Sequence, residues 1–184
     1  MRPGHSSTKL TYADFVLFPD DGLRHEIIDG EHYVTPAPVT RHQRISRNLL
    51  YLIQSYLEGQ PIWEVFHAPY DVLLSNFDIV EPDLVYISNE RAKFITSKNL
   101  QGPPDLAIEI LSPGTRRRDE RLKRDLYERV GVLEYWLVDP ERDVIRVYRS
   151  SGGSFQGPVQ YARTDVLTSP LMPGLELPLD RILA

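Results

Sequence analysis

Two carboxylates inside apolar segments are the residues of this sequence best suited to chemistry. Asp83 lies in an apolar stretch over residues 79–87, and Glu109 is the single charged residue of Leu106-Ala107-Ile108-Glu109-Ile110-Leu111. Burying an unpaired carboxylate is costly, so each should be paired, protonated or bound to a cation. On adjacent strands the two would repel each other unless a divalent ion lay between them, and oxygen ligands suit Mg²⁺ or Mn²⁺. The open alternative is that one or both lie at strand ends, in contact with arginine or water.

A lysine on a basic helix is the next candidate. The apolar spacing predicts a helix over about 118–130, whose buried stripe, at about 100° per residue, is Leu122, Leu126 and Val130. Asp119 falls within this stripe and Lys123 beside it, so Lys123 should turn toward the sheet. A half-buried lysine near two carboxylates can steady the water that attacks a phosphodiester, or its stem can simply cover apolar surface. The arginines expected to point away, as a solvated helix face, are Arg117, Arg121 and Arg124.

Glu26 and His42 could complete a site with these residues. Glu26 alternates with apolar neighbours in His25-Glu26-Ile27-Ile28, which can turn it toward the same cleft. His42 is in helical register with Ile45 and Leu49, at the edge of a buried face, where a lone histidine is more often a hydrogen-bonded packing residue. The sequence contains no serine elbow, glycine-rich phosphate loop or paired-histidine zinc pattern.

The elements that must position these residues alternate between helices and strands. Strands are expected over 25–29, 32–35 (after a tight turn at Gly30-Glu31), 63–74, 79–87, 105–111, 134–139 and 144–148, and helices from Thr11, over 41–57 and over 118–130. Pro170, Pro173 and Pro178 should allow only short edge strands near the end. This order predicts an α/β protein with a mixed sheet and helices on its faces.

Composition and length narrow the class of protein. The 184 residues, 41% hydrophobic and 26% charged, fit one domain over 1–184, with about 1–9 expected to be flexible. The absence of cysteine excludes disulfides, thiolate catalysis and cysteine-bound zinc. No apolar run approaches the roughly 18 residues of a membrane helix, and the N-terminus does not resemble a secretory signal. We therefore expect a cytoplasmic protein without membrane contact, although a net charge of −5 counts mildly against nucleic-acid binding.

Taken together, the motifs resemble those of the Uma-type (Uma-two) endonucleases, a family long catalogued as a domain of unknown function within the PD-(D/E)XK nuclease superfamily. The resemblance covers nearly the whole chain from Leu10 onward. The matching positions are 25–31, 36–42, 81–85, 102–113, Asp119, Lys123, Tyr127, 131–140 and 173–175. They are specific as a set, although no single one would be.

The resemblance implies a restriction-endonuclease-like core, with an extra N-terminal hairpin and C-terminal strands. It implies that Asp83, Glu109 and the main-chain carbonyl of Ile110 bind Mg²⁺ or Mn²⁺, and that Glu26 and His42 complete the site. The superfamily motif has a lysine two residues after its second acid, here Glu109, but this chain has Leu111 at that position. The resemblance to the Uma-type family implies that the helix lysine, Lys123, replaces this motif lysine from a different position in the chain.

Three functions compete at this point. The first is a metal-dependent endonuclease that hydrolyses the phosphodiesters of DNA; the sequence leaves its oligomeric state open, and a homodimer is one option because duplex cutters often work as two-fold dimers. The second is a catalytically inactive relative whose cleft binds nucleic acid or a partner protein. The third is a structural domain whose buried charges form an ion-pair network. The full set of Asp83, Glu109, Lys123, Glu26 and His42 favours the enzyme, and the acidic net charge favours the other two.

Overall fold

A six-stranded sheet forms the centre of the protein. The structure, a computed structural model, describes residues 8–58 and 63–184; the first seven residues of the expected flexible terminus lie outside that part. The strand order is β10-β9-β8-β7-β6-β3. In chain order these strands are β3 (Trp63–His67), β6 (Leu84–Ser88), β7 (Leu106–Ile110), β8 (Glu134–Asp139), β9 (Val144–Ser151) and β10 (Ser154–Ala162). Only β7 and β8 are parallel neighbours within the described sheet, so the predicted mixed sheet is confirmed.

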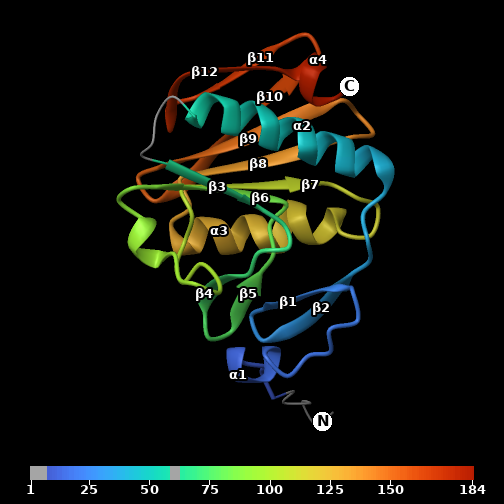
Figure 1. Ribbon diagram of the computed structural model, residues 1–184, viewed down its shortest axis with the longest axis vertical. Coiled ribbons are helices and arrows are strands. Elements are labelled where there is room, and N and C mark those ends of the chain that lie inside the picture. The colour runs from blue at the N-terminus through green and yellow to red at the C-terminus, as the bar shows by residue number, and fades with distance from the viewer. Residues whose placement is uncertain (1–7, 59–62) are drawn as a thin grey trace, which may run out of the picture.

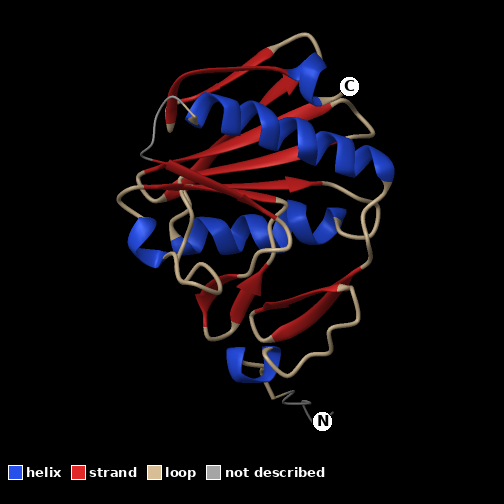
Figure 2. Cartoon of the chain, in the orientation of Figure 1, coloured by secondary structure: helices blue, strands red, loops and turns tan. Residues whose placement is uncertain are grey.

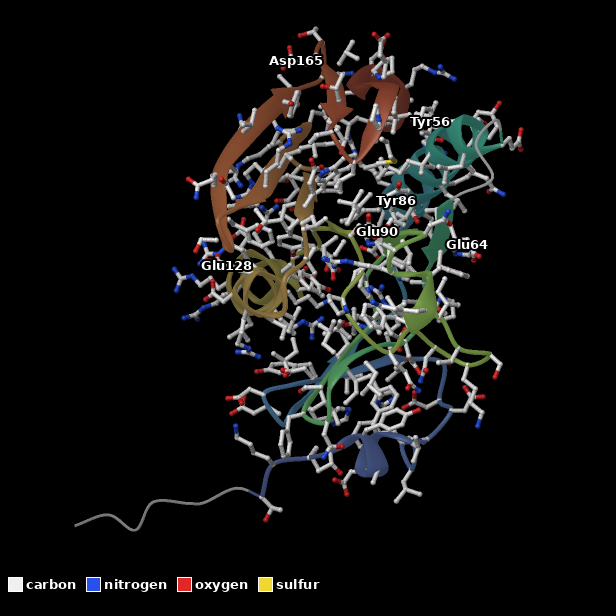
Figure 3. All side chains as sticks on the ribbon, turned by 90° about the vertical axis from the view of Figure 1, so that its left-hand side faces the viewer. Tyr56, Glu64, Tyr86, Glu90, Glu128 and Asp165 are labelled. Carbon is white, nitrogen blue, oxygen red and sulfur yellow. The ribbon has the colours of Figure 1, made fainter. Side chains whose placement is uncertain are left out.

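Helices cover both faces of this sheet (Figures 1 and 2). One face is packed by α2 (Thr40–Leu57), and the other by α3 (Arg124–Val130) with the π-helical turn η2 (Arg118–Lys123) before it. Figure 3 shows them from the side, with α2 marked by Tyr56 and α3 by Glu128. All five residues of β7 are buried, as expected for a central strand covered on both sides.

A second sheet lies beyond α3, near the N-terminus (Figure 1). Its order is β2-β1-β5-β4, from β1 (Arg24–Ile28), β2 (Glu31–Thr35), β4 (Val72–Ser75) and β5 (Asp78–Val80), with α1 (Tyr12–Phe15) beside it. The β1–β2 hairpin is the predicted one, but its turn lies at Asp29 and Gly30, one residue earlier. Both residues have positive φ, 53° and 77°, which is the pair that a type I′ turn requires.

The continuous strands predicted over 63–74 and 79–87 are wrong. Each segment breaks and passes between the two sheets: β3 is followed by β4, and β5 by β6. The breaks contain Pro69 and Pro82. Because proline has no N–H to give to a ladder, the chain leaves one sheet at these points and enters the other. The second break is where Glu81 and Asp83 lie.

The C-terminal strands cover the α2 side of the molecule. β11 (Val166–Ser169) and β12 (Met172–Pro178) form a two-stranded sheet, followed by α4 (Leu179–Ile182), and a short helix η1 (Ala92–Phe94) lies in the β6–β7 connection. The chain from residue 154 is more regular than predicted, because β10 is a nine-residue edge strand that accommodates Pro158 at a register shift. No helix in the described part of the chain is long and apolar enough to span a membrane.

Candidate active site

The register of two neighbouring strands brings Asp83 and Glu109 together. In the β6–β7 ladder Leu84 pairs with Ile108 and Val85 with Ala107. One step further along this register, Asp83, just before β6, falls opposite Glu109 near the end of β7. Both residues are buried, at 3% exposure each, and the N–H of Ile110, the residue after Glu109, donates to Asp83, so the two acids lie near each other at this end of β7.

The main-chain carbonyl of Ile110, at the next position of the same register, has no usual strand partner. Ile110 lies opposite Pro82, and its N–H donates to the carboxylate of Asp83 at 2.8 Å instead of to a strand partner. In an antiparallel pair the N–H and C=O of one residue face the same neighbour, so the Ile110 carbonyl also faces this side. Pro82 has no N–H to give to it. The carbonyl that the family resemblance singles out therefore faces the Asp83 side of β7 without a main-chain donor opposite.

Asp83 accepts hydrogen bonds from three elements. Besides the Ile110 N–H, Arg24 of β1 donates to Oδ1 at 2.8 Å, and His42 of α2 lies 3.1 Å from Oδ2. Burial alone would raise the pKa of Asp83, but His42 and Arg24 bring it below its usual range. An ionised carboxylate only accepts hydrogen bonds, so His42 carries its proton on Nε2. His42 is buried and hydrogen-bonded, as expected of a packing residue, but its partner is the candidate site residue Asp83.

Lys123 holds Glu109 and Glu26 together. Its ammonium lies 2.8 Å from Glu109 Oε1, 2.7 Å from Glu26 Oε1 and 3.7 Å from Asp119 Oδ1, and the hydroxyl of Tyr127 donates to Glu109 at 2.9 Å. Burial would lower the pKa of Lys123, but the charges of Glu109 and Glu26 raise it above its ordinary value. Lys123 is thus a charged, buried residue, and in the described structure its ion pairs do not include Asp83.

The helix phase predicted around Lys123 needs one correction. Leu122 is 44% exposed, whereas Lys123 is 2% exposed and lies with Asp119, Leu126 and Tyr127 on the buried side. The reason is the π-helical turn over Arg118–Lys123, whose hydrogen bonds span five residues and so take up more residues per turn. Counting at 100° per residue therefore places Leu122 on the wrong side.

The same turn explains a site residue that the sequence did not reveal. Arg118 lies five residues before Lys123 and points inward with it: its guanidinium is 3.2 Å from Glu26 Oε2 and donates to the hydroxyl of Thr35. The basic run was interpreted as a solvated face, and Arg117 and Arg121 are indeed exposed. The inward direction of Arg118 could be inferred from the sequence only if the π-helical turn were already known.

Glu81 and Arg24 were also missed. Glu81 is 8% exposed, and its Oε2 has no hydrogen-bond partner among the described residues. Arg24 pairs with Asp83, as described above. Both stand within two residues of a residue that the sequence did single out, Asp83 and Glu26. Position along the chain could have drawn attention to them, but the sequence does not indicate which face of the backbone they take.

The buried acids outnumber the cations that pair with them. The buried carboxyl side chains of the cluster are Glu26, Glu81, Asp83, Glu109 and Asp119, and in the described structure its cations are Arg24, Arg118 and Lys123. With all of these eight groups ionised, the five carboxylates exceed the three cations by two charges. Burial accordingly raises the pKa of Glu109 to about 8 and that of Glu81 to about 7, since the surplus is relieved by protons when no other cation is present.

A cleft opens over this cluster between the β1–β2 hairpin and the start of α2. It consists of two adjoining hollows of about 440 and 510 Å³, which share Arg24, Thr35, Ala37, Pro38 and His42 in their walls. The first hollow reaches Glu81 and Asp83, and the second is bounded by Arg41 and by residues 111–114 that follow β7. The cleft therefore leads from solvent to the Asp83 end of the cluster.

The donor set at this end fits a hard divalent cation. No three or more His, Asp or Glu side chains of the described residues converge as a ready-made metal cage. The set implied by the resemblance contains only two carboxylates, with the Ile110 carbonyl as a third oxygen. All three are oxygen donors, as Mg²⁺ and Mn²⁺ prefer, and the surplus of two negative charges equals the charge of one such ion.

Comparison with known proteins agrees with this geometry. A family model, Uma2, described as "Putative restriction endonuclease", matches residues 12–180. The chain belongs to the Uma2 family. A crystal structure of "a putative nuclease belonging to DUF820" from Anabaena variabilis has the same fold, with a TM-score of 0.80 and 21% identity over 95% of this chain and 97% of that one. No curated protein matches the chain.

Within this Uma2 fold, the six residues predicted for the site lie in one region. Asp83, Glu109 and Ile110 come from β7 and the residue before β6, whereas Glu26, His42 and Lys123 come from β1, α2 and η2. The structure divides them into two contacting groups: Asp83 with His42 and Ile110, and Glu109 with Glu26 and Lys123. The restriction-endonuclease-like class of fold predicted from the sequence is confirmed for this Uma2 protein.

Proposed function

We propose that this protein is a metal-dependent endonuclease that hydrolyses phosphodiester bonds of DNA. The observation that carries the proposal is the buried pair Asp83 and Glu109, in a cluster whose carboxylates outnumber its cations by two and whose Asp83 end lines an open cleft. A structural ion-pair network would be expected to balance its charges, because a buried unpaired carboxylate destabilises a fold. The surplus charge therefore favours a site that takes up a cation over the purely structural alternative.

Asp83, Glu109 and the main-chain carbonyl of Ile110 would hold the ion. When bound, Mg²⁺ or Mn²⁺ supplies positive charge that polarises the phosphodiester and stabilises the charge that develops during its hydrolysis. His42 keeps Asp83 ionised and oriented through a hydrogen bond from Nε2. Each of these groups is fixed by main-chain or side-chain contacts, which is the preorganisation that catalysis requires.

Lys123 and Glu26 would act on the Glu109 side of the ion. Lys123 fixes the carboxylate of Glu109 through its 2.8 Å ion pair, and its charge would steady the water that attacks the phosphodiester. Glu26 orients Lys123 from the other side, at 2.7 Å, and is itself held by the main-chain N–H of Glu81. Lys123 therefore takes the place that the superfamily motif gives to a lysine two residues after the acid.

DNA would enter by the cleft and extend over the basic side of η2. Arg41 lines the second hollow, and Arg117 and Arg121 are exposed on the helical segment that carries Lys123. Positive charge beside the site compensates locally for the acidic net charge, since phosphate contacts depend on local rather than total charge. Neutralising Arg117 or Arg121 should weaken DNA binding and flatten its salt dependence without changing the cleavage rate of the bound complex.

The test is cleavage of plasmid and linear DNA with Mg²⁺ or Mn²⁺, followed by addition of EDTA. Wild-type protein should cleave and EDTA should stop it, and Asp83→Asn and Glu109→Gln should each reduce the rate by about 100-fold or more. The matched control is Glu64→Gln, which removes an exposed carboxylate of β3 outside the cluster and should cleave normally. Cleavage at wild-type rate in both site variants would show that the activity is a contaminant.

The inactive alternative gives a different result in the same assay. A protein that binds DNA with normal salt dependence but cleaves none with either metal would be a nucleic-acid-binding relative. A protein that neither binds nor cleaves DNA would direct attention to a protein partner for the cleft. Either result overturns the nuclease proposal.

A further inference from the structure

Arg24 differs from the other two cations of the cluster in how it is held. The side chains of Lys123 and Arg118 are 3% and 10% exposed, and each lies within 4.0 Å of at least two carboxylates. Arg24 is 21% exposed, has one ion pair in the described structure, with Asp83, and its Nε is buried without a hydrogen-bond partner. Of the three cations, Arg24 therefore loses the fewest contacts if it leaves its acid.

Arg24 also lies beside Asp83 in the wall of the open cleft. The side chain of Asp83 is 4% exposed, and the guanidinium of Arg24 covers its Oδ1 at 2.8 Å. Arg24 lines both hollows, so a guanidinium released from Asp83 would remain in the cleft. There its planar set of donors would suit a phosphate group, which arginine binds in bidentate fashion.

We infer that Arg24 is a displaceable counter-ion of Asp83: it occupies the carboxylate in the metal-free protein, and gives it up to a divalent cation to bind the phosphate of the substrate. This inference rests on the proposed function, because it takes Asp83 as a metal ligand. It adds a coupling between metal and DNA, since the ion that displaces Arg24 also makes a phosphate contact available. Metal and DNA should therefore each raise the affinity for the other.

Metal affinity without DNA is the first measurement. Arg24→Gln keeps a hydrogen-bond donor for Asp83 but removes the competing charge, so calorimetric titration with Mn²⁺ should give a Kd lower by about tenfold or more than that of the wild type. Arg24→Lys keeps the charge and should bind Mn²⁺ nearly as the wild type does. Asp83→Asn should abolish the binding, which ties the titrated ion to this site.

A charge-matched control separates direct competition from general electrostatics. Arg118→Gln removes the same charge from the same cluster, but Arg118 pairs with Glu26 and not with Asp83. It should tighten Mn²⁺ binding clearly less than Arg24→Gln does. Circular dichroism of each variant verifies the fold, and Arg24→Met provides a second neutral replacement if Arg24→Gln is poorly folded.

DNA binding is the second measurement, on a short duplex with hydrolysis-resistant phosphorothioate linkages. In EDTA the wild type and Arg24→Gln should bind the duplex equally, because Arg24 is still engaged by Asp83. With Mn²⁺ the wild type should gain affinity and the variant should gain several-fold less.

The outcomes distinguish the two proposals. Unchanged or weaker Mn²⁺ binding by Arg24→Gln, or equal tightening by Arg118→Gln, overturns the role of Arg24 and leaves the metal site standing if Asp83→Asn abolishes binding. Failure of the wild type and of Arg24→Gln to bind Mn²⁺ at all overturns the metal site, and with it the role of Arg24.

Discussion

Replacing Glu109 by glutamine should stabilise the metal-free protein while abolishing cleavage. The cluster has five buried carboxyls and three cations, so removing one acid improves its charge balance. Burial raises the pKa of Glu109 from its ordinary 4.5 to about 8, although Lys123 acts in the opposite direction. A carboxyl whose pKa is raised on folding stabilises the fold below its unfolded pKa, and this stability is lost as the pH rises through the folded pKa.

The size of the effect follows from this shift. Ionised Glu109 costs the folded protein at most about 5 kcal/mol above pH 8. The attraction of Lys123 is already contained in this pKa, so glutamine offsets the gain only through a weaker hydrogen bond from Tyr127, by roughly 1 kcal/mol. The variant should therefore exceed the wild type by at most about 4 kcal/mol in alkaline solution and nearly match it in acid, with the difference growing between pH 4.5 and pH 8.

The assay is urea unfolding in EDTA near pH 5 and near pH 9, which gives the free energy of unfolding from the midpoint and slope. Addition of Mg²⁺ or Mn²⁺ near neutral pH should then stabilise the wild type and leave Glu109→Gln nearly unchanged, by mass action. The reasoning is refuted if Glu109→Gln is no more stable than the wild type near pH 9 in EDTA.

Four further substitutions test other parts of the structure. Lys123→Met leaves the buried acids with two cations, and urea unfolding should show a loss of about 3–5 kcal/mol, in contrast to Glu109→Gln. Leu126→Ala should cost about 2–5 kcal/mol and Leu122→Ala less than about 1 kcal/mol, because the π turn leaves Leu122 exposed; equal losses would contradict that turn. Burial would raise the pKa of Asp139, but Arg116 lowers it to about 2, so its contribution is complete above 3.8 and lost as the pH falls through 2. Asp139→Asn should thus be less stable by on the order of 1–2 kcal/mol at neutral pH and equal to the wild type near pH 2, as acid-unfolding curves would show.

The sequence by itself determined the elements whose signal is local. The apolar run around Glu109 indicates a strand covered on both faces, and β7 is such a strand. The spacing of Ile45, Leu49 and Ile53 indicates the buried face of α2, and all three are buried. Local periodicity reports burial directly, because each residue's face is set by its own backbone geometry. The choice of Asp83 and Glu109 as candidates followed from the same reasoning, since a charge in an apolar run needs a partner.

Only the tertiary structure decided what those partners are. The β6–β7 register, which pairs Leu84 with Ile108, brings Asp83 to the end of β7 that carries Glu109 and Ile110, and a shift of one residue would have given Asp83 other neighbours. Arg24 reaches Asp83 across 59 residues of sequence, a distance that no local pattern spans. Arg118 points inward because a π turn alters the helical phase, which counting at a fixed angle could not anticipate. Burial is therefore readable from the sequence, whereas the pairing of buried charges depends on strand register and helix phase, which exist only once the chain has packed.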